Sequence, residues 1–157
     1  MKHLVDVAYK KIKQQYDYNT PRQLVNDAGV KLLEMPLDDK TGGMSVTNNR
    51  CSTIILNAEW DDHYLDFVML HELAHLKLHK HESTPFYRRV GNDQFVPQNE
   101  HEANSLAMRL LLDLKDHDVI CQLTKYQLMD YLGVDRYLAQ YVWSKFNDWR
   151  IMQKPQR

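Results

Sequence analysis

The sequence predicts an α+β fold, in which a small, mostly antiparallel sheet packs on one buried helix and further helices follow toward the C-terminus. Three observations predict this fold. Residues 67–79 form an apolar run without Gly or Pro, which is typical of a helix that is buried nearly all round. Strand-like segments separated by turn residues precede this run, and capped amphipathic segments follow it. Strands and helices that occupy separate parts of a chain favour an α+β architecture.

The composition is that of an ordinary globular chain. Its 157 residues are 43% hydrophobic and 26% charged, and a domain of this size buries roughly 68–70% of its unfolded surface. The formal net charge of -1 provides no general attraction to nucleic acid or to anionic membranes. We expect a cytoplasmic protein with free thiols at Cys51 and Cys121, because we find neither a secretory signal nor the roughly 20 apolar residues that span a bilayer.

The N-terminal part is predicted to be helical. Residues 2–17 form an amphipathic helix whose apolar stripe comprises Leu4, Val5, Ala8, Tyr9, Ile12 and Tyr16. Thr20 and Pro21 are a cap followed by proline at the first helical position, so a short helix spans residues 21–28 and ends at Gly29.

The segments that follow are predicted to be strands. Residues 30–37 are strand-like, and residues 38–43 form a turn that contains two glycines. Residues 44–47 and 51–56 then form a β-hairpin about Asn48 and Asn49. The sheet must cover the buried helix, and its exposed edge is also suited to hold an extended peptide.

The buried helix and its successors complete the chain. Asp61 or Asp62 caps the helix, which we expect to run to about His81 before a loop at residues 82–98. Residues 99–115 form the next helix, with a stripe of Ala103, Leu106, Ala107, Leu110 and Leu111. Thr124 and Gln127 form a capping box for a helix that ends at Gly133. Asp135 caps the last helix, whose stripe is Leu138, Tyr141, Val142, Phe146 and Trp149, ahead of a polar tail.

The buried helix carries the motif H-E-x-x-H at His71, Glu72 and His75. Residues four apart on a helix have Cβ atoms about 5–6 Å apart on one face, so the two imidazoles can direct nitrogen atoms at one ion. Glu72 borders that point without occupying it, where a general base would lie. Two histidines and a carboxylate in so apolar a helix would be costly to desolvate unless something binds them.

A catalytic zinc usually takes three protein ligands, and several residues compete for the third position. His79 lies about 12 Å along the helix axis from His71, too far to share its ion. His81 has the histidine spacing of the metzincin pattern, but Leu78 stands where that pattern needs glycine to turn the chain back. Glu100 and Glu102 lie on the next helix about 200° apart, so that only one of them can serve.

The segment from Glu100 to Asn104 resembles the E-x-x-x-D arrangement of gluzincin peptidases. This resemblance implies that Glu100 is the third ligand, and Glu102 is the fallback ligand. It also implies that residue 104 orients a ligand histidine. Asn104 replaces the usual aspartate, and its amide oxygen can still accept a hydrogen bond from an imidazole.

The helix at residues 67–79, the Thr84-Pro85-Phe86-Tyr87 segment, and Glu100 to Asn104 followed by three leucines together resemble the ImmA/IrrE family of metallopeptidases. The resemblance implies one zincin-like domain over residues 1–157, with N-terminal helices in 1–29, a catalytic core in 30–115 and a helical part in 116–157. It also implies a cytoplasmic zinc endopeptidase of phages or mobile elements that acts on a helix-turn-helix repressor and so relieves repression. Carried over to this chain, the zinc ligands would be His71, His75 and Glu100.

In the chemistry expected of such a site, Glu72 is the catalytic acid and base, and Tyr64, Tyr87 or His101 could stabilise the oxyanion. Two imidazoles and one carboxylate suit several divalent metals besides zinc. One alternative is a zinc-containing binding module that grips a repressor without efficient cleavage. A second is DNA binding through residues 128–142, which are aromatic rather than basic. We therefore expect a protein substrate, no direct contact with nucleic acid and no membrane association.

Overall fold

In the computed structural model, the described residues are 2–79, 86–88 and 97–142. The elements in chain order are helices α1 (Lys2–Gln15) and α2 (Pro21–Asp27), strands β1 (Lys31–Met35), β2 (Thr41–Asn48) and β3 (Cys51–Asn57), helix α3 (Asp62–Leu78), strand β4 (Phe86–Arg88), helices α4 (Gln98–Asp113), α5 (His117–Ile120) and α6 (Lys125–Leu132), and the 3-10 helix η1 (Arg136–Leu138). The predicted α+β class is confirmed.

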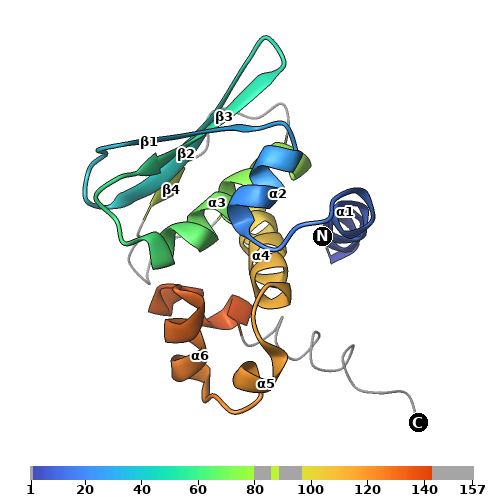
Figure 1. The fold of residues 1–157 in the computed structure, drawn as a ribbon, viewed down its shortest axis with the longest axis vertical. Coiled ribbons are helices and arrows are strands. Elements are labelled where there is room, and N and C mark those ends of the chain that lie inside the picture. Colours follow the sequence, from blue (N-terminus) through green and yellow to red (C-terminus); the bar gives the residue numbers. More distant parts are fainter. Residues whose placement is uncertain (1, 80–85, 89–96, 143–157) are drawn as a thin grey trace.

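The four described strands form a mixed sheet in the order β1-β3-β2-β4 (Figure 1). Strand β2 pairs antiparallel with both β3 and β4, whereas β1 pairs parallel with β3. The sheet is therefore mostly antiparallel, as predicted. The three-residue strand β4 lies within the segment predicted as a loop. It was not predicted because so short a run shows no alternation of apolar and polar residues.

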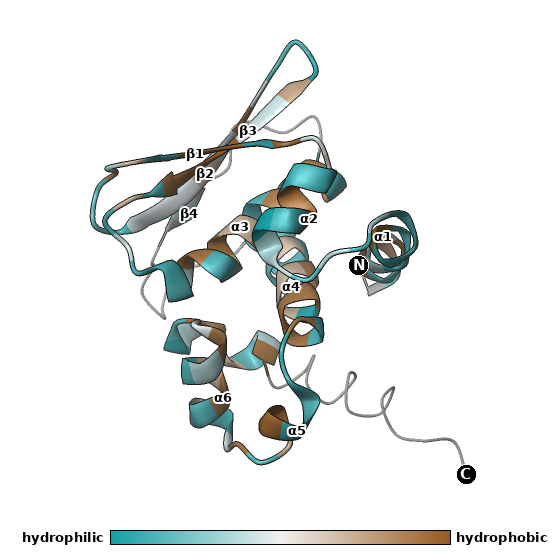
Figure 2. Cartoon of the chain, viewed as in Figure 1, coloured by the Kyte–Doolittle hydropathy of each residue, from teal (hydrophilic) through white to brown (hydrophobic). Residues whose placement is uncertain are grey.

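Helix α3 lies at the centre of the fold and contacts α1, α2, α4, α6 and strands β2, β3 and β4. Its residues 67–75 are all buried, which explains why the sequence shows no polar stripe there. The sheet covers one side of α3 and the helices cover another (Figure 1). Hydrophobic residues recur along both α3 and α4 in Figure 2, and the five residues of the predicted α4 stripe are fully buried.

The structure corrects two predicted boundaries. Helix α3 ends at Leu78 rather than about His81, because His79 leaves helical geometry at φ -132° and ψ 55°; His81 itself lies outside the described residues. The predicted turn at 38–43 is shorter, since β2 already begins at Thr41. Gly43 therefore lies inside β2 rather than in the turn. A Cβ at this position would come within 2.7 Å of Val68 on α3, so the close packing of β2 on α3 requires glycine here.

Predictions for the two ends of the chain have mixed outcomes. In α1, Val5 and Ile12 are buried, but Leu4 is 45% exposed because the stripe centres on those two residues. The predicted capping box of Thr124 and Gln127 is present, and Gly133 ends α6 in the left-handed conformation. The short helix α5 was not predicted. Phe146, Trp149 and the tail lie outside the described residues.

The segment considered for DNA binding packs into the core. Six of its apolar residues are at most 4% exposed, as expected of helices that pack on the rest of the fold: Leu128, Met129, Leu132, Val134, Leu138 and Val142. Among the described residues, no helix is both long and apolar enough to cross a membrane.

Candidate metal centre

Helix α3 places the two histidines and the glutamate of the H-E-x-x-H motif inside the core. His71 and Glu72 are fully buried and His75 is 2% exposed. The helix delivers them there because its neighbouring residues are apolar on every side and its N-terminus is capped by the side chain of Asp61. Polar groups at such depth need partners.

Helix α4 brings Glu100 to the same point. Its Oε1 lies 2.8 Å from His75 Nε2 and its Oε2 lies 3.2 Å from His71 Nε2, and the two Nε2 atoms are 3.2 Å apart. Ligands at about 2.0–2.1 Å in a tetrahedral zinc shell lie about 3.3 Å from one another. The donor set and its spacing therefore fit a divalent metal, and this buried cluster is compatible with metal binding.

The electrostatics of Glu100 favour its ionised form. Burial by itself would raise the pKa of this carboxyl, but hydrogen bonds from His71 and His75 outweigh burial and hold the pKa well below its usual value. A ligand carboxylate must be deprotonated to bind a metal. The cluster thus keeps Glu100 in the form that coordination requires.

Glu72 has the opposite environment. Burial raises its pKa to about 8, although the charge of His75 and the nearby Ser45 hydroxyl lower it. Neither carboxylate oxygen of Glu72 forms a hydrogen bond of normal geometry, and the Ser45 hydroxyl also has no such partner. A fully buried carboxyl group without a well-formed hydrogen bond is costly in a fold. Glu72 is therefore available to interact with a molecule that enters the site.

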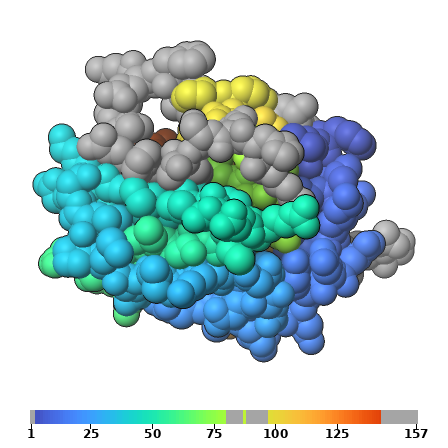
Figure 3. Space-filling model, turned by 90° about the horizontal axis from the view of Figure 1, so that it is seen from above, coloured from blue at the N-terminus to red at the C-terminus, as the bar shows by residue number. Residues whose placement is uncertain are grey.

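Aromatic side chains surround His71. The ring centroid of Tyr87 on β4 lies 4.9 Å from the ring centroid of His71. The ring centroid of Phe67 lies 6.1 Å from that of His71. Tyr137 donates a 2.7 Å hydrogen bond to the Tyr87 hydroxyl and so links η1 to β4. Seen from above, α3 is visible in green between the β2–β3 hairpin and the start of α4 (Figure 3).

The other predicted site residues occupy different positions. Tyr87 lies in the wall of the site, and His101 hydrogen-bonds through Nδ1 to the Tyr141 hydroxyl. Tyr64 packs its ring against His63, nearer the start of α3. The fallback ligand Glu102 lies outside the metal cluster, with its Oε1 3.7 Å from His79 Nε2.

The predicted contact of Asn104 with a ligand histidine is not formed. Asn104 is 5% exposed, and its Oδ1 has no hydrogen-bond partner. Its side chain instead faces Tyr141, whose pKa is raised by burial and lowered by this contact. The side chain of Asn104 thus supports Tyr141 rather than His71 or His75.

Sequence reasoning missed Ser45, Tyr137 and Tyr141, and it excluded His79 as a metal ligand, expecting it to cap the wall of the site or to extend toward solvent. Ser45 had one recognisable signal. It lies two residues after Gly43 and so shares the face of β2 that packs on α3. The tyrosines had no such signal, since their approach to the site depends on how η1 and the helical residues 139–142 after it return to β4 and α4.

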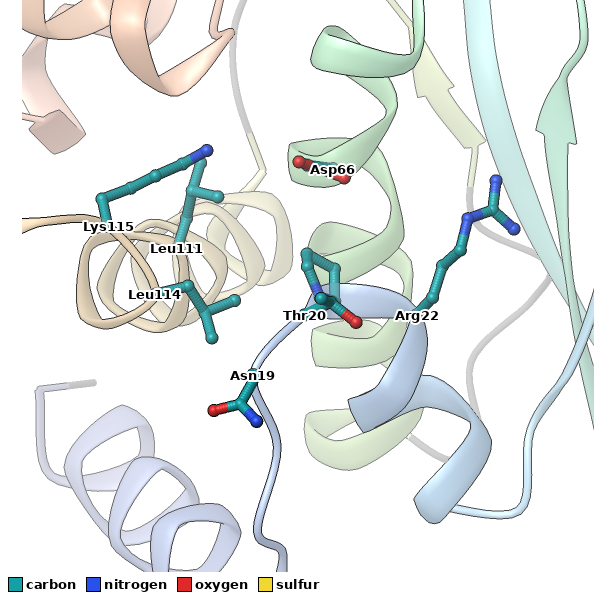
Figure 4. Close-up of a pocket in the computed structure, with 8 residues that line it drawn as sticks. Asn19, Thr20, Arg22, Asp66, Leu111, Leu114 and Lys115 are labelled. Carbon is teal, nitrogen blue, oxygen red and sulfur yellow. The ribbon is translucent and has the colours of Figure 1, made fainter.

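A separate pocket of about 340 Å³ lies between α2, α3 and α4 (Figure 4). Asp66 and Lys115 line it together with Asn19, Thr20, Pro21, Arg22, Leu111 and Leu114. Asp66 precedes His75 by nine positions, which is about 180° around the helix. The pocket therefore opens on the opposite side of α3 from the metal cluster.

Comparison with known proteins defines the class to which this fold and site belong. Residues 25–144 match the family described as the IrrE N-terminal-like domain of peptidase family M78. The chain belongs to this peptidase family, which confirms the resemblance found in the sequence.

More particularly, the chain is similar to "Uncharacterized immunity region protein 2" of Bacillus phage phi105. The two are 28% identical over 109 residues, which cover 69% of this chain and 68% of the phage protein. No solved structure gives a significant match.

Proposed function

We propose that this chain is a cytoplasmic, zinc-dependent endopeptidase. His71, His75 and Glu100 would hold the zinc, and Glu72 would be the catalytic acid and base. The single observation that carries this proposal is the convergence of three donor atoms beside the fully buried carboxyl group of Glu72, which forms no hydrogen bond of normal geometry. Membership of a peptidase family supports the same chemistry.

The proposed division of labour follows from the positions of the side chains. Bound zinc would supply Lewis acidity, which activates water and polarises a carbonyl. Glu72 would accept the proton of the attacking water and pass it to the leaving amine. Tyr87, with its ring against His71, would shape the wall of the site and help to exclude water from it.

We propose a protein as the substrate, specifically a helix-turn-helix repressor of a prophage or mobile element, whose cleavage would relieve repression. The likeness to a phage immunity region protein supports this setting. The sheet supports a peptide substrate, because β4 is at the edge of the sheet that the described strands form and carries a side chain that contacts His71. Edge strands bind extended peptides through main-chain hydrogen bonds.

The test uses the purified protein and a helix-turn-helix repressor encoded beside it. Intact mass is followed over time for the wild type, for Glu72→Gln and for the wild type with a chelator. We expect specific fragments from the wild type, loss of cleavage with chelator, and a fall of about 10²- to 10⁴-fold in rate for Glu72→Gln. Glu59→Gln, a matched change at an exposed glutamate, should cleave as the wild type does.

Other results would change the assignment. Equal cleavage by Glu72→Gln would overturn the role of Glu72. A stable complex without fragments would instead identify a zinc-containing binding module that acts on the repressor by holding it. Reloading the chelated protein with zinc or with other divalent ions, one at a time, would determine which metal restores cleavage.

A further inference from the structure

The side of His75 that faces away from the metal cluster contacts a second pair of side chains, His79 and Glu102. His75 Nδ1 lies 3.1 Å from His79 Nδ1, and His79 Nε2 lies 3.7 Å from Glu102 Oε1. The side chains of His79 and Glu102 are only 8% and 11% exposed. These three groups form a chain from the end of α3 to α4.

The positions of the protons along this chain follow from the chemistry of imidazole. His75 Nε2, which lies 2.8 Å from Glu100 and can donate to it in the absence of a metal, must be unprotonated to bind one, so the proton of the neutral ring would then reside on Nδ1. The atom next to this N–H is His79 Nδ1. It can accept a hydrogen bond from His75 only when it is itself unprotonated and offers its lone pair. His79 then carries its own proton on Nε2, directed toward the negative charge of Glu102.

The backbone reinforces this arrangement. His79 is the C-terminal cap of α3, and its amide N–H donates a 2.7 Å hydrogen bond to the His75 carbonyl. The imidazole of His79 is therefore anchored one turn beyond that of His75. Glu102, at 3.7 Å, acts on His79 through its charge, since this distance exceeds that of a hydrogen bond.

The other metal-facing histidine has no such support. His71 Nδ1 is buried and has no hydrogen-bond partner. Asn104, the residue expected to orient a ligand histidine, faces Tyr141. Among the described residues, the hydrogen bond that can orient an imidazole of the cluster is the one between His75 and His79.

We propose that His79, held by Glu102, is the positioning residue for His75: it fixes the tautomer and ring orientation that present Nε2 to the metal. This inference rests on the proposed metal site. Partners of ligand histidines are commonly worth about 10- to 100-fold in metal affinity. Loss of His79 should therefore weaken metal binding without abolishing it.

The experiment measures the zinc affinity of the full chain by competition with a chromophoric chelator, and the visible spectrum of its Co²⁺-loaded form. His79→Leu removes the acceptor while keeping bulk, whereas His79→Asn places an amide oxygen near the position of Nδ1. We expect His79→Leu to bind zinc about 10- to 100-fold more weakly, with a shifted Co²⁺ spectrum. His79→Asn should restore most of the affinity, and Glu102→Gln should fall between them.

Two further variants separate this inference from the proposed function. If neither the wild type nor His75→Ala binds zinc, the metal site itself is wrong. If the wild type binds one zinc, His75→Ala loses it and His79→Leu matches the wild type in affinity and spectrum, only the role of His79 is overturned. Equal losses in the Leu and Asn variants also contradict the acceptor role, and the exposed His3→Leu controls for loss of a histidine elsewhere.

Discussion

At the scale of single residues, two glutamates near one point have opposite electrostatics. Hydrogen bonds from two histidines keep the pKa of Glu100 low against the effect of burial, whereas burial raises the pKa of Glu72 to about 8. Separation of two pKa values by environment is how enzymes assign different tasks to similar groups. The contrast supports a ligand role for Glu100 and a proton-transfer role for Glu72.

Asp66, on the far side of α3, provides a prediction about pH. Burial raises its pKa above the ordinary value, although Lys115, His63 and Arg22 lower it. The folded state then binds the proton more tightly than the unfolded state, so this group costs stability as pH rises from about 4 through its folded pKa. Asp66→Asn should raise Tm slightly at pH 7, by less than about 3 °C, and the gain should vanish below about pH 4.

Thermal unfolding of wild type and variant across pH 3–8 measures this effect. Asp17→Asn, at an exposed carboxyl, is the matched control and should change little. A lower Tm for Asp66→Asn at pH 7 would mean that attraction to the neighbouring cations outweighs the cost of burying the charge.

Which residues could be predicted from the sequence depends on where their partners lie in the chain. His71, Glu72 and His75 share one helical turn, so their arrangement follows from local geometry. Glu100 comes from another helix and was placed through a family resemblance. Ser45, Tyr137 and Tyr141 approach the site only through tertiary packing, which no local pattern records. The metal-binding role of His71, His75 and Glu100 and the catalytic role of Glu72 remain predictions.

At the scale of elements, the junction between α6 and α3 depends on Gly133. It has φ +72°, and a Cβ there would come within 2.3 Å of the His63 carbonyl oxygen. The side chain of His63 also bonds the Asp130 carbonyl at 2.7 Å. Gly133→Ala should destabilise the fold by about 2–4 kcal/mol, from left-handed strain together with overpacking.

Chemical denaturation checks this prediction, with Gly29→Ala as the matched control. Gly29 has φ +75° but nothing within 4 Å of its Cβ position, so its substitution reports strain alone, at about 1–2 kcal/mol. Equal losses at the two positions would show that the contact between α6 and α3 can relax.

Long elements were predicted well because they carry repeated signals. Helix α3 and the β2–β3 hairpin combine an apolar pattern with a cap or turn residues, and α4 has an apolar stripe over several turns. The elements that were missed, β4 and α5, have three and four residues, too few for any period. In the sheet, β3 lies between β1 and β2. The sequence did not predict this strand order, because tertiary contacts decide which strands become neighbours.

At the scale of the whole molecule, the proposed zinc would join α3 to α4. A ligand that binds only the folded state stabilises it by about 2.7 kcal/mol at 100 times its dissociation constant. Removing zinc with a chelator should therefore lower Tm by about 5–10 °C for a chain of this size. Differential scanning calorimetry of the metal-loaded and chelated protein measures the shift.

The variant Glu100→Gln is the control for chelation, because it lacks one proposed ligand and should respond weakly to added zinc. The contact of α4 with α1 should be unaffected, since it depends on Arg109 and Asp6, 2.6 Å apart, and on Tyr9 and Asp113. An unchanged Tm on chelation of a protein verified to hold zinc would contradict this picture.

The order of the proposed ligands along the chain has a consequence for biosynthesis. Strands β1, β2 and β3 and helix α3 all leave the ribosome before Glu100 does. The nascent chain can therefore assemble its sheet and H-E-x-x-H helix while holding only two of the three metal donors. Docking of α4 would complete the proposed set of ligands, so a newly made molecule would gain the proposed metal and hydrolytic activity only late in synthesis.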